Sequence, residues 1–148
     1  MIEYIYNFLQ LSDNIATAGQ PTDEQFTTIA QEGYEVVINL GLIGTKYALE
    51  DEAGLIRDLG IKYIQIPVVW EEPKRENFEL FVSVMEENQG KKVFVHCAAN
   101  MRVSVFMALY RILQLGWEHK LAFAEVYKIW EPNETWKAFV KLMLNQEG

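Results

Sequence analysis

Short apolar runs alternate with amphipathic stretches along the chain, and this pattern predicts strands that alternate with helices. The runs that we interpret as strands are residues 15–18, 36–40, 61–66 and 92–97. Between them, apolar residues recur at the spacing of one helix face, for example at Phe78, Phe81, Val82 and Met85. The pattern is typical of an α/β fold with a central, mostly parallel sheet of about four to five strands flanked by helices.

Local signals place several of the helix ends. Thr22 is a candidate N-cap, with Gln25 as its capping-box partner, and Gly33 stands where a helix of this length would end. Residues 103–115 are apolar on nearly every face, which predicts a buried, centrally packed helix. Two further helices are expected at about residues 120–130 and 136–145.

Length and charge limit the classes of function. The 148 residues suit one domain, residues 1–148, and 50% of them are hydrophobic, which is enough for a sizeable core. The formal net charge of -8 argues against nucleic acid as a partner and gives no reason to expect an anionic membrane surface. A small, locally positive pocket for an anion remains compatible with this charge. The oligomeric state is left open.

The numbers of cysteine and histidine residues limit which disulfides and metal sites the chain can form. One cysteine excludes an internal disulfide, and with two histidines it leaves little for a metal site, so no cofactor is expected. The first ten residues lack the basic region of a signal peptide, and no run of about 18 apolar residues could span a membrane. We therefore expect a cytoplasmic protein.

The segment 96–104, His-Cys-Ala-Ala-Asn-Met-Arg-Val-Ser, joins a predicted buried strand to a predicted buried helix. Ligands of α/β proteins bind at the carboxyl ends of the strands, where the amides of the next helix can hold an anion. Such a cradle favours the thiolate of Cys97, which is a competent nucleophile. Arg102 adds a cation that a bound anion would satisfy.

The residues His96, Cys97, Arg102 and Ser104 resemble the signature loop of the protein tyrosine/dual-specificity phosphatase superfamily. Residues 19–21 (Gly-Gln-Pro), the strand at 36–40 and residues 66–68 (Ile-Pro-Val) resemble a bacterial, phosphatase-like branch of it. The resemblance implies that Cys97 is the nucleophile, Arg102 grips phosphate, His96 orients the loop, and Ser104 assists departure of the thiolate. The implied phosphate-binding set is His96, Ala98, Ala99, Asn100, Met101, Arg102, Val103 and Ser104, with Trp70 at the rim.

The spacing of this loop differs from that of the superfamily, which has five residues between cysteine and arginine where this chain has four. Either the loop is one residue short, or Asn100 replaces the usual glycine and Val103 occupies the usual arginine position. We favour the second alignment, because asparagine tolerates a positive φ better than other non-glycine residues. Arg102 is then displaced by about 100° around the helix start.

The residue at the position of the general acid also differs from that of the superfamily. The superfamily places an aspartate in the loop after the strand that ends in proline. Here Trp70 falls near that position and is followed by Glu71 and Glu72. We expect Glu71 to be the proton donor, with Glu72 as the alternative. Trp70 is expected to overhang the pocket, and Lys46 and Tyr47 are further candidates for its rim.

Three hypotheses of function follow. The first is a Cys-dependent phosphomonoesterase that forms a cysteinyl-phosphate. The second is a protein that binds a phosphorylated substrate, or a free phosphate or sulfate anion, without turnover. The third is a rhodanese-like sulfurtransferase, because four residues between cysteine and arginine are also common in that family.

Overall fold

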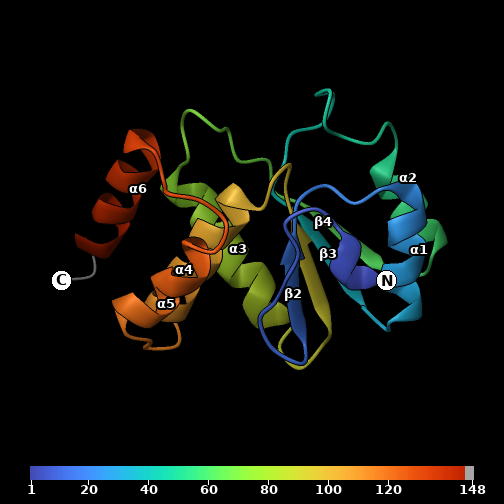
Figure 1. Cartoon of the computed structure of the whole chain (residues 1–148), viewed down its shortest axis with the longest axis horizontal. Coiled ribbons are helices and arrows are strands. Elements are labelled where there is room, and N and C mark those ends of the chain that lie inside the picture. Colours follow the sequence, from blue (N-terminus) through green and yellow to red (C-terminus); the bar gives the residue numbers. More distant parts are fainter. Residues whose placement is uncertain (146–148) are drawn as a thin grey trace.

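The computed structural model describes residues 1–145. The helices and strands follow one another along the chain as Figure 1 labels them. They are η1 (Ile2–Tyr4), β1 (Leu9–Gln10), β2 (Ile15–Ala18), α1 (Asp23–Gln31), β3 (Val36–Asn39), α2 (Glu52–Asp58), β4 (Lys62–Gln65), α3 (Arg75–Glu87), β5 (Val93–His96), α4 (Met101–Leu113), α5 (His119–Val126) and α6 (Glu134–Asn145).

The five strands form one sheet in the order β1-β2-β5-β3-β4. Four of them are parallel, and β1 alone runs antiparallel, against β2. The predicted α/β fold with a mostly parallel sheet is therefore confirmed. Strand β5 is central, and His96 at its end is in register with Ala18 of β2 and Asn39 of β3. The carboxyl ends of three strands thus meet at one edge, next to Cys97.

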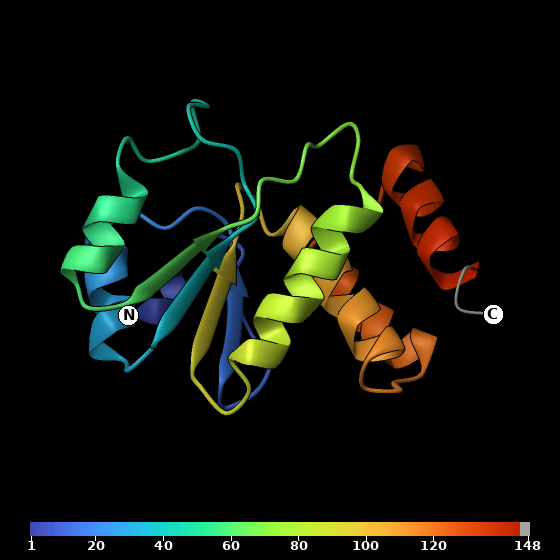
Figure 2. The same cartoon turned by 180° about the vertical axis from the view of Figure 1, so that it is seen from behind.

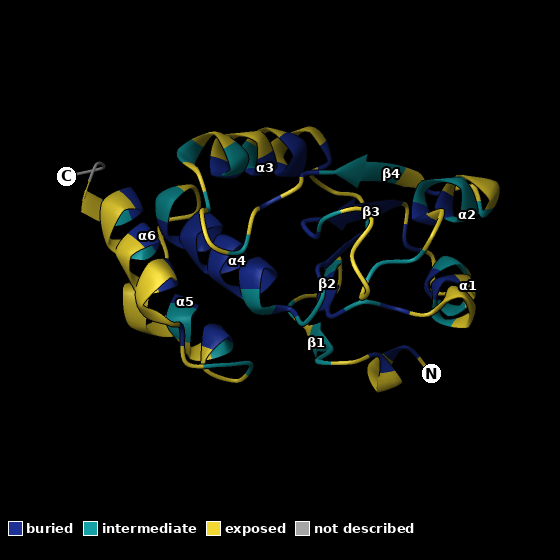
Figure 3. Cartoon of the chain, turned by 90° about the horizontal axis from the view of Figure 1, so that it is seen from above, coloured by how far each residue is buried: buried dark blue, intermediate teal, exposed yellow. Residues whose placement is uncertain are grey.

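Helices cover both faces of the sheet (Figures 1 and 2). Helices α1 and α2 pack on one face, around a core that includes Phe26, Ile56 and Phe94. Helices α3 and α4 pack on the other face, and α5 and α6 pack against α4, around a larger core that includes Phe106. Helix α4 is dark blue along most of its length in Figure 3, and its residues are buried continuously from Arg102 to Ile112. The predicted central packing of this apolar helix is confirmed.

Local sequence signals account for how several elements begin and end. Thr22 and Gln25 form the predicted capping box of α1, and Gly33 follows the helix with a φ of 90°. Helix α5 ends at Val126, earlier than predicted, because the amides of Lys128 and Ile129 bond to carbonyls three residues back. Strand β1 was not predicted, since two residues carry no period that a pattern can reveal.

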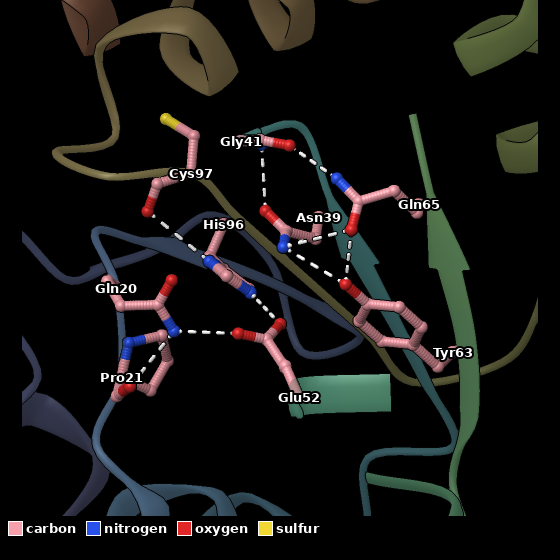
Figure 4. A network of polar contacts seen from close by, with 9 residues as sticks. All are labelled: Gln20, Pro21, Asn39, Gly41, Glu52, Tyr63, Gln65, His96 and Cys97. Atoms are coloured by element: carbon pink, nitrogen blue, oxygen red, sulfur yellow. Dashed lines mark hydrogen bonds and ion pairs between the residues drawn. The ribbon is translucent and has the colours of Figure 1, made fainter. Parts of the chain in front are cut away.

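A hydrogen-bonded cluster at the ends of β3 and β4 holds the loop that begins at Gly41 (Figure 4). The amide of Asn39 donates to the hydroxyl of Tyr63 at 3.0 Å, and that hydroxyl donates to Oε1 of Gln65 at 2.5 Å. Both polar groups of Gly41 are tied to this cluster, its N–H to Asn39 Oδ1 and its carbonyl to the Gln65 amide. The loop of residues 41–50 therefore leaves the sheet from a fixed point.

We expect Phe106→Ala to lower the free energy of unfolding by about 3–5 kcal/mol, because Phe106 is fully buried among four aromatic rings. The matched control is Leu142→Ala on α6, whose side chain is 49% exposed and whose loss should change stability by no more than about 0.5 kcal/mol. Denaturant unfolding measures both values. Equal midpoints for the two variants would contradict the assigned core.

Tyr63, in the cluster at Gly41, is expected to ionise at a higher pH than an ordinary tyrosine. Burial, the largest cause, raises the pKa of Tyr63 from 10.0 to about 12, and the pKa of Tyr110 is raised to about 12 for the same leading reason. The folded state favours the neutral phenol, so its stabilisation is complete below about pH 10 and is lost as the pH rises towards 12. Absorbance titration of phenolate should show that Tyr63→Phe removes about half of the phase near pH 12, as should the control Tyr110→Phe. An unchanged amplitude in Tyr63→Phe would refute the assignment.

Candidate active site

Hydrogen bonds from segments near the N-terminus hold the carbonyl groups of the loop between β5 and α4. The carbonyl of Ala98 accepts from the backbone nitrogen of Gln20 at 3.0 Å, and the carbonyl of Ala99 accepts from the side-chain nitrogen of Asn7 at 2.9 Å. Gly19 pairs with Ala99 in a β-bridge, and a Cβ at Gly19 would lie only 2.7 Å from the Ala98 carbonyl oxygen. The close approach of these two segments therefore requires glycine at position 19.

Asn100 turns the loop into α4. Its φ is 64°, so the predicted left-handed conformation at this position is confirmed. Its side-chain amide donates to the carbonyl of Asn7 at 2.8 Å and to Thr17 Oγ1 at 3.0 Å. Asparagine thus supplies the turn of a glycine together with two bonds that a glycine lacks.

The inner side of the loop presents unsatisfied donors. Among the residues described, the backbone N–H groups of Ala98, Ala99, Met101, Arg102 and Val103 donate to no acceptor in the protein. The first N–H groups of a helix are free in this way, and they lie at the positive end of its dipole. Together with the preceding loop they form the type of amide cluster that binds an anion.

A cleft of about 600 Å³ opens at this edge of the sheet. Most of its lining comes from three loops, those after β5, β3 and β4, and the loops after β3 and β4 rise at the top of Figure 1. Of the residues singled out from the sequence, those that line the cleft are Cys97, Ala98, Ala99, Met101, Arg102, Trp70, Glu71, Lys46 and Tyr47. His96, Asn100, Val103, Ser104 and Glu72 are not part of the lining.

Other lining residues were not singled out from the sequence. They include Tyr6, Gln20, Asn39, Leu42 and Thr45. Each lies in a segment far from the signature loop along the chain, and only the order of the strands brings it there. The Gly-Gln-Pro motif was the one available signal, since it contains Gln20.

Arg102 is a buried cation without a charged partner. Its side chain is in the cleft lining although the residue is only 8% exposed, and it forms no ion pair within residues 1–145. Nη1 donates to the carbonyl of Val68 at 2.8 Å, and the guanidinium carbon lies 6.0 Å from the centre of the Trp70 ring. A buried charge that lacks a countercharge is unfavourable, and an anion in the cleft would compensate it.

Trp70 connects the loop after β4 to the aromatic core. Its ring lies 5.3 Å from that of Trp130 and 6.0 Å from that of Trp136, and its carbonyl accepts from Trp136 Nε1 at 2.9 Å. Trp70 is therefore fixed on one side by these rings and faces Arg102 and the cleft on the other. Glu71 follows it and lines the cleft, whereas Glu72 does not.

Val103 and Ser104 lie behind the loop. Val103 is fully buried in the larger core. The Ser104 hydroxyl donates to the Met101 carbonyl at 2.7 Å and accepts from Trp130 Nε1 at 3.1 Å. Val103 thus serves packing, whereas Arg102, one residue earlier, lines the cleft.

His96 is buried beneath Cys97. Nε2 lies 2.5 Å from Glu52 Oε2, and Nδ1 lies 3.3 Å from the carbonyl oxygen of Cys97. Gln20 donates to the other carboxylate oxygen of Glu52 at 2.8 Å. In Figure 4 the sulfur of Cys97 points away from the imidazole ring, so His96 contacts the backbone of Cys97 and not its thiol.

The chain shows neither a metal cluster nor a membrane helix where it is described. Within residues 1–145 no three His, Cys, Asp or Glu side chains lie together as metal ligands would. No helix in the same range has the length and apolarity to cross a bilayer.

The chain resembles curated proteins over part of their length. The beta-lactamase hydrolase-like proteins of two strains of Xylella fastidiosa are 25% identical to it over 108 residues. The aligned region is 71% of this chain but 25% of the relative, so the chain spans about a quarter of the length of these relatives.

Solved structures share the fold over nearly the whole chain. A putative phosphatase (DUF442) from Shewanella putrefaciens CN-32 is 32% identical, with a TM-score of 0.88 over 99% of this chain and 97% of its own. The core catalytic domain of the PP-IP phosphatase SIW14 from S. cerevisiae, in complex with citrate, is 16% identical, with a TM-score of 0.76 over 93% and 85% of the two chains. The second likeness concerns the fold alone.

The resemblance to protein tyrosine/dual-specificity phosphatases is confirmed by a family match. The family described as "DSP-PTPase phosphatase fused to NAD+ Kinase" (PTP-NADK) matches residues 9–140. Because this match includes the sheet, the signature loop and the three loops around the cleft, the chain belongs to the PTP-NADK family of phosphatases.

Proposed function

We propose that residues 1–148 act as one phosphatase-like domain that hydrolyses phosphomonoesters through a cysteinyl-phosphate intermediate. The observation that carries this proposal is the convergence of Cys97, a row of free amides and the uncompensated guanidinium of Arg102 on one cleft. Amides and guanidinium together match the equatorial oxygens of a phosphoryl group. Membership of a phosphatase family supports the same ligand class.

The reaction has two steps. The Cys97 thiolate attacks phosphorus, so that a phosphorus–sulfur bond forms while the ester phosphorus–oxygen bond breaks and Glu71 protonates the leaving oxygen. Water then attacks phosphorus, Glu71 accepts its proton, and the phosphorus–sulfur bond breaks to release phosphate and the thiolate. Glu71 is preferred to Glu72 as the acid because it lines the cleft.

Binding without turnover is the second candidate, and the position of Arg102 favours it. Arg102 stands one residue nearer to the cysteine than in the superfamily, and its guanidinium already donates to the Val68 carbonyl. An arginine held in this way can bind the charge of the ligand in the ground state without binding the transition state more strongly. Such uniform binding does not accelerate the chemical step. The sulfurtransferase hypothesis rested on residue spacing alone, and we do not pursue it because the family is one of phosphatases.

The first test separates turnover from binding. We expect the wild type to release p-nitrophenol from its phosphate ester across about pH 5 to 8, and Cys97→Ser to release none while still binding inorganic phosphate in calorimetry. Acid-quenched wild type should carry a phosphate mass on the peptide that contains Cys97. Phosphate binding without hydrolysis would favour the second candidate, and the absence of both would exclude the two together.

The second test uses two neighbouring glutamates as a matched pair. Glu71→Gln should lower kcat by about 10²- to 10⁴-fold for an alkyl phosphate and much less for p-nitrophenyl phosphate, whose leaving group needs little protonation. Glu72→Gln removes the same charge outside the cleft and should stay close to the wild type. Steady-state kinetics on both substrates measures the contrast. Equal losses in the two variants would argue against Glu71 as the acid.

A further inference from the structure

Both ring nitrogens of His96 face hydrogen-bond acceptors. Nδ1 faces the Cys97 carbonyl oxygen at 3.3 Å, and Nε2 faces Glu52 Oε2 at 2.5 Å. His96 is fully buried and Glu52 is 6% exposed, so water does not substitute for either partner. The superfamily resemblance assigns a role to the histidine, but it assigns none to Glu52.

The acceptors determine how many protons the pair holds. A carbonyl oxygen can only accept, so Nδ1 must carry a hydrogen to bond with Cys97. Between Nε2 and a carboxylate oxygen one proton is also required, since two lone pairs at 2.5 Å would repel. We place that proton on Nε2, so that an imidazolium faces the Glu52 carboxylate and the pair as a whole is neutral.

The neutrality of the His96–Glu52 pair affects the anion site, because Glu52 lies beneath the loop that carries Cys97. An unpaired carboxylate at this position would place a negative charge beneath the loop that holds the thiolate and the anion, and in a buried site such a charge acts strongly. From α1, the apolar ring of Phe26 packs edge-on against His96 at 5.7 Å. Of the other titratable groups, Cys97 follows His96 directly, and Tyr63 lies near enough that Glu52 adds to the effect of burial, which is the main cause of its raised pKa.

Gln20 connects the same glutamate to the outer side of the loop. Its side-chain nitrogen donates to Glu52 Oε1 at 2.8 Å and to the Pro21 carbonyl at 3.0 Å, while its backbone nitrogen donates to the Ala98 carbonyl. Glu52 is therefore linked to Cys97 through His96 and to Ala98 through Gln20. Two consecutive carbonyls of the signature loop are thus held by residues that both bind Glu52. Figure 4 shows His96 and Gln20 on the two oxygens of this carboxylate.

We propose that Glu52 is a positioning residue that keeps a proton on both nitrogens of His96, so that the Cys97 carbonyl stays bound beneath the loop. The thiol and the amides that follow it then remain directed to the cleft. The activity readout of this proposal rests on the proposed phosphatase function, but the protonation of His96 does not.

Nitrogen-15 NMR of histidine tests the protonation directly. The chain has two histidines, and His119 at the exposed start of α5 is an internal reference. In the wild type at neutral pH we expect His96 to show two slowly exchanging ring N–H signals. Glu52→Gln should reduce these to one, because a neutral amide can satisfy a neutral ring. A single N–H on His96 in the wild type would overturn the proposal, whether or not the variant folds.

Kinetics tests the consequence for the site. Glu52→Gln should lower kcat/KM roughly 10- to 100-fold, as expected when a reacting group is misplaced from a distance, and should change the shape of the pH–rate profile. Asp58→Asn makes the same charge change at an exposed position of α2 and should keep the wild-type profile. A wild-type profile in Glu52→Gln would refute a positioning role. A wild type without phosphatase activity would count against the proposed function alone, since the NMR result stands apart from it.

Discussion

The bonds that hold the outer carbonyls of residues 97–99 are the constraint on which the rest of this structure depends. His96, Gln20 and Asn7 each bind one of these carbonyls from below or from outside the loop. A peptide unit whose carbonyl is fixed on one side presents its N–H on the other, because the unit is planar and trans. The free amides of Ala98 and Ala99 are thus a consequence of the bonds that His96 and Gln20 make to the preceding carbonyls, whereas the free amides of Met101, Arg102 and Val103 belong to the first turn of α4.

The same constraint explains the charges around the cleft. The chain carries a net charge of -8, yet its candidate site offers free amides, a helix N-terminus and Arg102. The one carboxylate buried beneath the loop, that of Glu52, is paired with His96. Positive potential is therefore built locally from backbone dipoles and one guanidinium, and it does not need a basic surface.

Much of the fold could be predicted from local patterns, because they reflect contacts within one element. The capping box of Thr22, the buried strand that ends at His96 and the apolar helix after it all have signatures a few residues long. Asn100 could be predicted to take a positive φ from its residue type alone. Strand β1 and Asn7, by contrast, act through partners that lie far away in the sequence, and no local pattern identifies those partners.

The contacts of Arg102 have a physical consequence that the residue spacing does not reveal. From the start of α4, Arg102 reaches the carbonyl of Val68 and the face of Trp70, both in the loop that also carries Glu71. The cation that would hold the phosphoryl group and the proposed acid are thereby fixed to one segment. That segment is itself held by the rings of Trp130 and Trp136. The positions of both groups therefore depend on the same aromatic contacts of Trp70.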